Sequence, residues 1–372
     1  MYAPNPAVAC CLSSLRVMVR SELEFGGEDS LLRVVLEKSN DCDGGDGGNG
    51  NADELPSVAV FKGWKGLKQD EVADYVKRVM GEKEFAQKKT LQQSASPIIT
   101  LALRTCKNLS GTITVTMAAQ GLPVGAGLGS SAALSTAAAA SLLFLEKRAR
   151  GGGEGKVIST HLDENTLERI NELAFISESV LTGTPSGIDN TVSCYGGAVR
   201  LRRVEGGGTE FERLKSGGFA GVRVAITNTK IPRSTRQLVA GVREMKDKHR
   251  TVIKPIFQAI SAIVDQFCAA LGVSGGDKEV DYEKLFELIR LNQTLLDALG
   301  VGHQRITEIN EMTTSAFSVP TKLTGAGGGG CVFSILPPTT QFGDFKANIL
   351  GIDSKMEVFT SLLGGDGVKI VE

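Results

Sequence analysis

The stretch PVGAGLGSSAALSTAAAASLL, residues 123–143, places the most flexible residues of the chain directly before its most helix-prone ones. Its first part contains Gly125, Gly127 and Gly129, followed directly by Ser130 and Ser131. The preceding segment, GTITVTM (111–117), alternates Ile113, Val115 and Met117, which is the pattern of a half-buried strand. The alanine-rich remainder favours a slim helix. The order predicted here is therefore strand, glycine loop, serine pair, helix.

That order suits phosphate binding. Glycines allow backbone N–H groups to turn inward around an anion, and a helix N-terminus adds unpaired N–H donors and a positive dipole end. One serine can cap the helix while the other offers a hydroxyl to a metal on the phosphates. No Gly-Lys-Ser/Thr follows, so the loop is not a Walker A loop, and the Rossmann acidic residue is missing. The alternative is a turn before a buried helix.

A second glycine-rich loop, TGAGGGGC, occupies residues 324–331, and five of its eight positions are glycine. So many glycines indicate that the backbone approaches either a ligand or another loop closely. The alternative is a flexible hairpin.

Two further segments carry groups that suit a reaction on a phosphate. In SESVLTGTPSGIDNTVS (177–193), Glu178 falls near a helix end and Asp189 in a loop, where carboxylates can bind a metal and accept a proton. Asp189 can equally be a turn residue beside Gly187. TNTKIPRSTR (227–236) carries Arg233, which can bind a carboxylate with two hydrogen bonds or remain a surface charge.

Four motifs together resemble those of the GHMP kinase superfamily. PVGAGLGSSAAL is similar to its central phosphate-binding motif and KLTGAGGGGCVFSIL to its C-terminal motif. TGTPSGIDNTVSCYGG and TNTKIPRSTRQLVAGVR resemble the mevalonate kinases of eukaryotic, plant-like type. The resemblance implies an α+β fold of two domains, the first like ribosomal protein S5 domain 2 and the second ferredoxin-like. It implies an ATP-binding domain over 1–212 and a C-terminal domain over 213–372.

The resemblance also implies ATP-dependent phosphorylation of the 5-hydroxyl of mevalonate with Mg²⁺, by a homodimer. Asp189 matches the catalytic base, Ser131 and Glu178 match the metal ligands, and Arg233 and Thr235 match residues near the substrate. The implied ATP-binding residues are Gln120, Gly125, Ala126, Gly127, Leu128, Gly129, Ser130 and Ser131. The implied active-site loop contains Gly325, Ala326, Gly327 and Gly328.

Mevalonate kinases begin with a strand that carries a lysine, followed by a Gly-Glu-His segment, whereas PAVA (6–9) stands near the start of this sequence. We therefore expect the chain as given to be N-terminally incomplete, either as a fragment or as a shortened and compromised protein, and to be nearly inactive. Two other functions stay open: a GHMP-fold protein that binds nucleotide or a partner without turnover, and a kinase for another small alcohol, such as homoserine or phosphomevalonate.

The totals agree with a two-domain protein that binds small molecules. The length of 372 residues exceeds what a single core of roughly 250–300 residues allows. A net charge of −1 predicts no nucleic-acid or membrane partner, and seven cysteines without CxxC pairs predict reduced thiols.

The sequence shows no signal-peptide pattern, so we expect the protein in the cytoplasm, with the peroxisome as the alternative. Residues 40–54 are expected to be disordered, Pro255 to begin a new helix, and Gly300 to end one.

Overall fold

The structure is a computed structural model, and the part that can be described comprises residues 7–10, 16–24, 31–36, 57–80, 89–120, 128–150, 162–182, 185–203, 209–214, 219–271 and 280–370. These residues fall into two compact units, each built from segments distant in sequence. The first unit contains residues 1–14, 123–128 and 195–367, and the second contains residues 15–122, 129–194 and 368–372.

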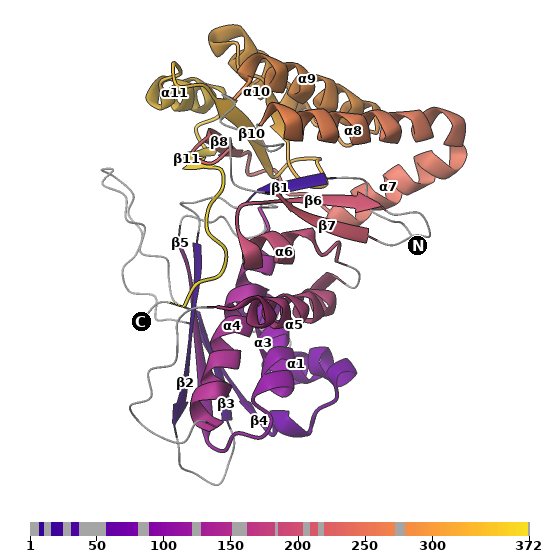
Figure 1. The fold of residues 1–372 in the computed structure, drawn as a ribbon. Helices are drawn as coiled ribbons and strands as arrows, with labels where there is room; N and C mark the ends of the chain where they lie inside the picture. Colours follow the sequence, from indigo (N-terminus) through magenta and orange to yellow (C-terminus); the bar gives the residue numbers. More distant parts are fainter. Residues whose placement is uncertain are drawn as a thin grey trace. The chain divides into compact units, whose positions relative to one another are not determined.

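The second unit is a four-stranded sheet with helices on one face (Figure 1). The strand order is β2-β5-β3-β4, in which β3 and β5 are parallel and the other pairs antiparallel. The strands are β2 (Arg16–Glu24), β3 (Leu31–Leu36), β4 (Ser57–Lys62) and β5 (Thr112–Gln120). The helices are α1 (Val72–Met80), α3 (Lys89–Thr105), α4 (Ser130–Arg150), α5 (Glu164–Thr182) and α6 (Ile188–Tyr195), with short 3-10 turns η1 (Trp64–Gly66) and η2 (Gln69–Glu71).

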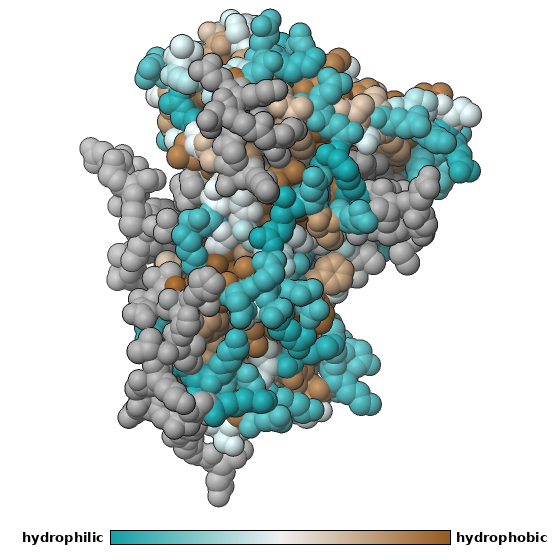
Figure 2. Space-filling model, in the orientation of Figure 1, coloured by the Kyte–Doolittle hydropathy of each residue, from teal (hydrophilic) through white to brown (hydrophobic). Residues whose placement is uncertain are grey.

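Alternation along the strands decides which face of this sheet is covered. On β5, Ile113, Val115 and Met117 are buried, as their spacing predicted. On β2, Arg20 and Glu22 point outward, whereas Ser21 bonds Ser141 of α4. The helices pack over the apolar face, and Figure 2 shows mainly hydrophilic residues on the visible surface of α1 and α5.

The first unit contains an antiparallel sheet with strand order β11-β8-β10-β9. Its strands are β8 (Arg223–Asn228), β9 (Thr321–Leu323), β10 (Cys331–Leu336) and β11 (Glu357–Leu362). Its helices are α7 (Thr235–Lys248), α8 (Arg250–Ala270), α9 (Tyr282–Ala298), α10 (Gln304–Phe317) and α11 (Phe342–Ile352). Helices connect β8 to β9 and β10 to β11, so this is the βαββαβ order of a ferredoxin-like domain, as expected.

Both faces of the ferredoxin-like sheet are buried. On β8, Val224 and Ile226 enter one core cluster, and Ala225 between them enters the other. The first cluster also includes residues of a small antiparallel sheet, β1 (Ala7–Cys10), β6 (Ala198–Arg203) and β7 (Thr209–Leu214). Strands β6 and β7 therefore belong to the first unit. The sequence analysis placed the end of the ATP-binding domain at residue 212, and that domain boundary stays a prediction.

Some local expectations are confirmed and others are wrong. Gly300 follows α9 with φ of 73°, which is the left-handed conformation of a helix stop. Pro255 lies inside α8 and does not begin it; the break falls at His249, whose backbone leaves the helical region. Residues 40–54 lie outside the described part.

The helix α8 is long and apolar enough to cross a membrane by length and composition alone, a test that core helices also pass. Its Ile260, Val264 and Cys268 are buried in the core clusters. The absence of membrane association stays a prediction.

Candidate active site: a carboxylate cluster at the start of α4, and a glycine loop

The N-terminus of α4 lies where the sequence placed a helix after the glycine motif. Gly129 has φ of 71°, in the left-handed region that favours glycine, and its carbonyl accepts the amide of Ala133. Ser130 and Ser131 form the first turn, which contains no acidic residue of its own. The positive end of the helix therefore favours negative charge supplied from outside the helix.

The earlier part of the motif cannot be placed. Gly125, Ala126 and Gly127 lie outside the described residues, as does the side chain of Gln120. Leu128 is described, and it packs against the core cluster of the first unit.

A buried carboxylate from α5 meets this first turn. The hydroxyl of Ser131 donates to Oε1 of Glu178 at 2.6 Å, and Ser135, one turn further along α4, donates to the same oxygen at 3.0 Å. Ser177 in turn donates to Ser135 at 3.1 Å. Glu178 is only 7% exposed. Sequence reasoning missed Ser135, although its position four residues after Ser131 on an alanine-rich helix was a usable signal.

Burial raises the pKa of Glu178, the hydrogen bonds from Ser131 and Ser135 oppose that rise, and the charge of Asp189 adds to it. A bound cation would remove this electrostatic cost. Glu178 and Ser131 both present oxygen, the ligand atom that Mg²⁺ prefers, so these residues fit that metal. The described residues contain no cluster of three or more His, Cys, Asp or Glu side chains that could hold a metal ion.

Asp189 lies beside the start of α4. The structure corrects the expectation of a loop here, because Asp189 is in the first turn of α6. A Cβ built on Gly129 would lie 3.7 Å from both Cβ and Cγ of Asp189, so the end of the glycine motif and this carboxylate are neighbours. The Asp189 side chain is exposed, yet the protein around it raises the pKa of its carboxyl by desolvation. An exposed carboxylate with a raised pKa suits a proton acceptor.

In the first unit, Arg233 is attached to the glycine-rich loop. Its Nη1 donates to the carbonyls of Thr324 and Gly327 at 2.9 and 3.3 Å, and burial lowers its pKa. Thr229 and Ile231 bond Gly330 from the same segment. The Nη1 group of Arg233 is thus committed to the loop.

The glycines of this loop are explained by protein packing. A Cβ on Gly327 would lie 2.2 Å from the carbonyl oxygen of Val301, and one on Gly329 would lie 2.7 Å from Ile231. One on Gly328 would lie 2.8 Å from Leu238. Of the two sequence readings, close approach to another segment is therefore the one these three glycines show.

The structure also places the other residues predicted for the active-site loop and for substrate binding. Gly325 is exposed with φ of 59°, and Ala326 is half-buried beside it. Thr235 is exposed as the first residue of α7, after Ser234, which caps the helix. The structure does not test the roles proposed for these residues.

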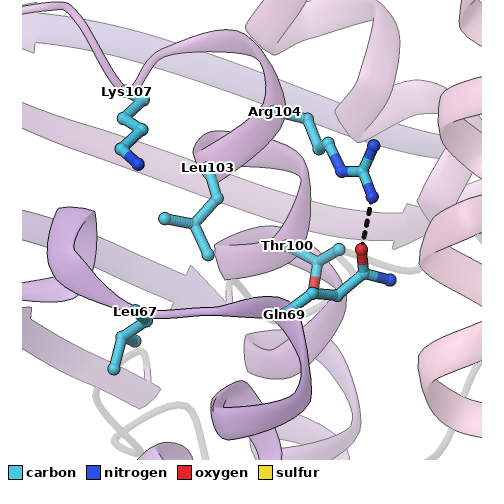
Figure 3. A pocket seen from close by; sticks show the side chains of 6 residues that line it. All are labelled: Leu67, Gln69, Thr100, Leu103, Arg104 and Lys107. Carbon is cyan, nitrogen blue, oxygen red and sulfur yellow. Dashed lines mark hydrogen bonds between the residues drawn. The ribbon is translucent and has the colours of Figure 1, made fainter.

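A separate hollow of about 230 Å³ lies against α3, lined by Leu67, Gln69, Thr100, Leu103, Arg104 and Lys107 (Figure 3). Arg104 donates to Gln69 across it, and the buried hydroxyl of Thr100 has no hydrogen-bond partner among the described residues. Basic residues near the C-terminus of α3 are favoured by the helix dipole, which explains their presence without a ligand. The hollow is therefore not by itself a binding site.

Comparison with known proteins agrees with this geometry. Residues 97–197 match the profile of the GHMP kinases N terminal domain. The mevalonate kinase of Arabidopsis thaliana is 38% identical over 255 residues, which are 67% of this chain and 63% of that protein. The mevalonate kinase of Mus musculus is 41% identical over 249 residues, 66% of this chain and 61% of that protein. The alignments thus span less than two thirds of these curated relatives.

The fold matches as well. A crystal structure of L. major mevalonate kinase in complex with R-mevalonate superposes with a TM-score of 0.66 at 20% identity, covering 97% of this chain and 90% of that one. Galactokinase from Lactococcus lactis gives a TM-score of 0.63 at 15% identity, covering 98% and 90%. The chain therefore has the fold of these kinases, and its residues 97–197 are similar to the GHMP kinases N terminal domain. The two relatives compared by sequence are both mevalonate kinases.

Proposed function

We propose that this protein transfers the γ-phosphoryl group of ATP to the 5-hydroxyl of (R)-mevalonate, with Mg²⁺, giving 5-phosphomevalonate. The observation that carries the proposal is the contact of Ser131 with Glu178 at the start of α4, with Asp189 beside Gly129. Sequence similarity to the mevalonate kinases of four organisms supports the choice of substrate. They are Arabidopsis thaliana, Schizosaccharomyces pombe, Mus musculus and Dictyostelium discoideum.

The second unit supplies the groups for phosphoryl transfer, a reaction that depends on positioning and charge stabilisation. The N–H groups of the α4 N-terminus bind phosphate oxygens. Ser131 and Glu178 would hold Mg²⁺, and that ion would supply neutralisation of the phosphate charge. Asp189 accepts the proton of the alcohol as its oxygen attacks the phosphorus.

The first unit supplies a carboxylate-binding group in this proposal. Arg233 uses its remaining N–H groups to bind the carboxylate of mevalonate, which leaves the far hydroxyl free to react. Thr235 is proposed to lie close to the same substrate. The half-buried position of Arg233 strengthens a charge-assisted bond there.

The test is a substrate panel with purified protein, ATP and Mg²⁺. ADP release is followed for mevalonate, homoserine and phosphomevalonate, and the product is identified by mass spectrometry, with Asp189→Asn as the inactive control. Phosphomevalonate formed from mevalonate alone supports the proposal. Preference for another alcohol would assign a different GHMP kinase activity. Nucleotide binding without turnover of any alcohol would support the non-catalytic alternative.

We also propose that the protein is a cytoplasmic homodimer, for which the resemblance to mevalonate kinases is the support. Sedimentation equilibrium of the purified protein and fractionation of its native cells test the two statements.

A further inference from the structure

The helix α5 contacts both neighbouring elements of the proposed catalytic cluster. Asn171 and Glu178 are seven residues apart on α5, so they lie on one face, about 10 Å apart along the helix axis. Glu178 accepts from Ser131 and Ser135 of α4. Asn171 accepts from the amide of Asn190 in α6, with Nδ2 to Oδ1 at 2.6 Å. The spacing of α4 and α6 is thus set by one rigid element.

The contact at Asn171 fixes the turn that bears Asp189. Asn190 directly follows Asp189 and is 2% exposed. Asn171 also donates to the hydroxyl of Thr191 at 3.4 Å, and that hydroxyl donates to the carbonyl of Gly187 at 2.6 Å. Asn190 and Thr191, the two residues after Asp189, are therefore both hydrogen-bonded to Asn171. Gly187, which precedes the helix, is connected to Asn171 through Thr191.

A polar connection in this place fixes orientation in a way that an apolar contact would not. A hydrogen bond prefers a donor angle above about 150° and weakens steeply below about 120°, whereas the attraction between apolar groups has no preferred direction. Successive residues of a helix point about 100° apart, so holding Asn190 against α5 also sets the direction of the Asp189 carboxylate. Catalytic groups misplaced by about 1 Å can lose on the order of 100-fold in rate.

We propose that Asn171, through Asn190, is a positioning residue that sets the place of the Asp189 carboxylate relative to Glu178. The inference rests on the proposed function, because it assigns a purpose to the spacing of the proposed base and the proposed metal ligand. Asn171 itself does not touch the substrate in this scheme.

The experiment compares Asn171→Ala, Asn171→Asp and the control Glu172→Ala in the whole protein. Glu172 is the next residue on α5, is exposed, and pairs with the exposed Arg169. Asn171→Ala is expected to lower kcat about 10- to 100-fold while both KM values change little. Asn171→Asp keeps an oxygen that accepts from Asn190, so it should retain most of the parent's kcat. The kcat values of the variants and the parent are compared at the plateau of each protein's pH profile. Glu172→Ala should match the parent.

A double-mutant cycle and hydrogen exchange complete the test. Because Asn171 and Asn190 act as one unit, Asn171→Ala/Asn190→Ala should be little worse than either single variant. In Asn171→Ala, amides of residues 187–195 should exchange faster while those of 130–140 keep the parent rate.

The outcomes separate this inference from the proposed function. A kcat of Asn171→Ala within twofold of an active parent, with or without a lower melting temperature, would overturn the inference and leave the kinase activity standing. If the parent transfers no phosphoryl group, the proposed function fails. Hydrogen exchange then decides whether Asn171 holds α6, and unchanged exchange at 187–195 overturns the positioning role as well.

Discussion

Ser131 donates its hydroxyl to Oε1 of Glu178 at 2.6 Å, joining the first turn of α4 to a helix 47 residues further along the chain. The contact places a carboxylate at the positive end of a helix, where its charge is favoured. Burial nevertheless raises the pKa of Glu178. The carboxylate is thus held in a place that costs stability until a cation joins it.

Replacing Glu178 with Gln should therefore stabilise the metal-free protein and weaken its response to Mg²⁺. The pKa of Glu178 is raised on folding, so above that raised pKa its ionisation destabilises the folded state, and an amide removes this cost while its oxygen can still accept from Ser131. We expect the melting temperature at pH 7.5 in EDTA to rise by roughly 2–4 °C for each kcal/mol gained. The Mg²⁺-induced shift and turnover should both fall.

The matched control is Glu172→Gln, an exposed change on the same helix that should alter neither the melting temperature nor the Mg²⁺ response. A lower melting temperature of Glu178→Gln in EDTA, with its Mg²⁺ shift intact, would remove Glu178 from the metal site.

Asp189→Asn should lower kcat about 10²- to 10⁴-fold, the range for a general base, with little change in ATP binding. The measurement is steady-state turnover together with nucleotide titration. A loss of turnover below tenfold would show that another group accepts the proton.

The pH dependence of kcat follows from the same residue. Desolvation raises the pKa of Asp189 above its usual 3.8, and the base must be ionised to work. Activity should therefore be complete above the raised pKa and decline as the pH falls through it, so the acid limb lies above the range of an ordinary aspartate. The residual activity of Asp189→Asn should lack this limb, and a limb of the same position in the variant would assign it to another group.

Arg233→Ala should raise KM for mevalonate and also lower the melting temperature. Its guanidinium bonds the carbonyls of Thr324 and Gly327, so the variant loses contacts to the loop as well as to the proposed substrate. Bonds to charged groups contribute about 1.5–3 kcal/mol, which corresponds to a roughly 10- to 150-fold change. KM for ATP should change far less, and Arg233→Lys should recover stability better than mevalonate affinity. A variant impaired only toward ATP would place Arg233 at the phosphates.

Much of this arrangement is visible in the sequence because it depends on local pattern. The alternation in 111–117 predicts β5, and the glycine–serine–alanine order predicts the start of α4. Asp189 was expected in a loop beside Gly187, a turn residue, yet the chain enters α6 at Ile188. Single-sequence patterns also carry no signal for long-range bonds such as that between Asn171 and Asn190, nor for the sharing of Glu178 by two serines.

Single-sequence patterns also carry no signal for the grouping of β6 and β7 with the unit that contains the ferredoxin-like sheet. Strand pairing of β6 with β1 and the ion pair of Arg200 with Asp265 of α8 hold these strands to that unit. These contacts join residues far apart in the chain, which composition cannot reveal.

The glycine-rich loop allows a sharp test of why its glycines are there. Gly327→Ala should destabilise the protein, since a Cβ would lie 2.2 Å from the carbonyl oxygen of Val301 and φ at Gly327 is 78°. The left-handed backbone costs an alanine about 1–2 kcal/mol, and relieving the overlap costs about 1–3 kcal/mol more. Val301 also accepts the amide of Gly328 at 2.8 Å, so moving its carbonyl weakens that bond too.

Gly343→Ala is the matched control, because Gly343 lies in α11 with no atom within 4 Å of an added Cβ and no positive φ. An alanine there should stabilise the helix by about 0.5–1 kcal/mol. The stability of Gly328→Ala should lie between those of the other two variants, because its Cβ would overlap the side chain of Leu238, which is flexible enough to move. Thermal melting of the three variants without ligands decides the matter. If Gly327→Ala has the melting temperature of the parent yet a lower affinity for ATP or mevalonate, the glycine serves the approach of a ligand and not the packing against Val301.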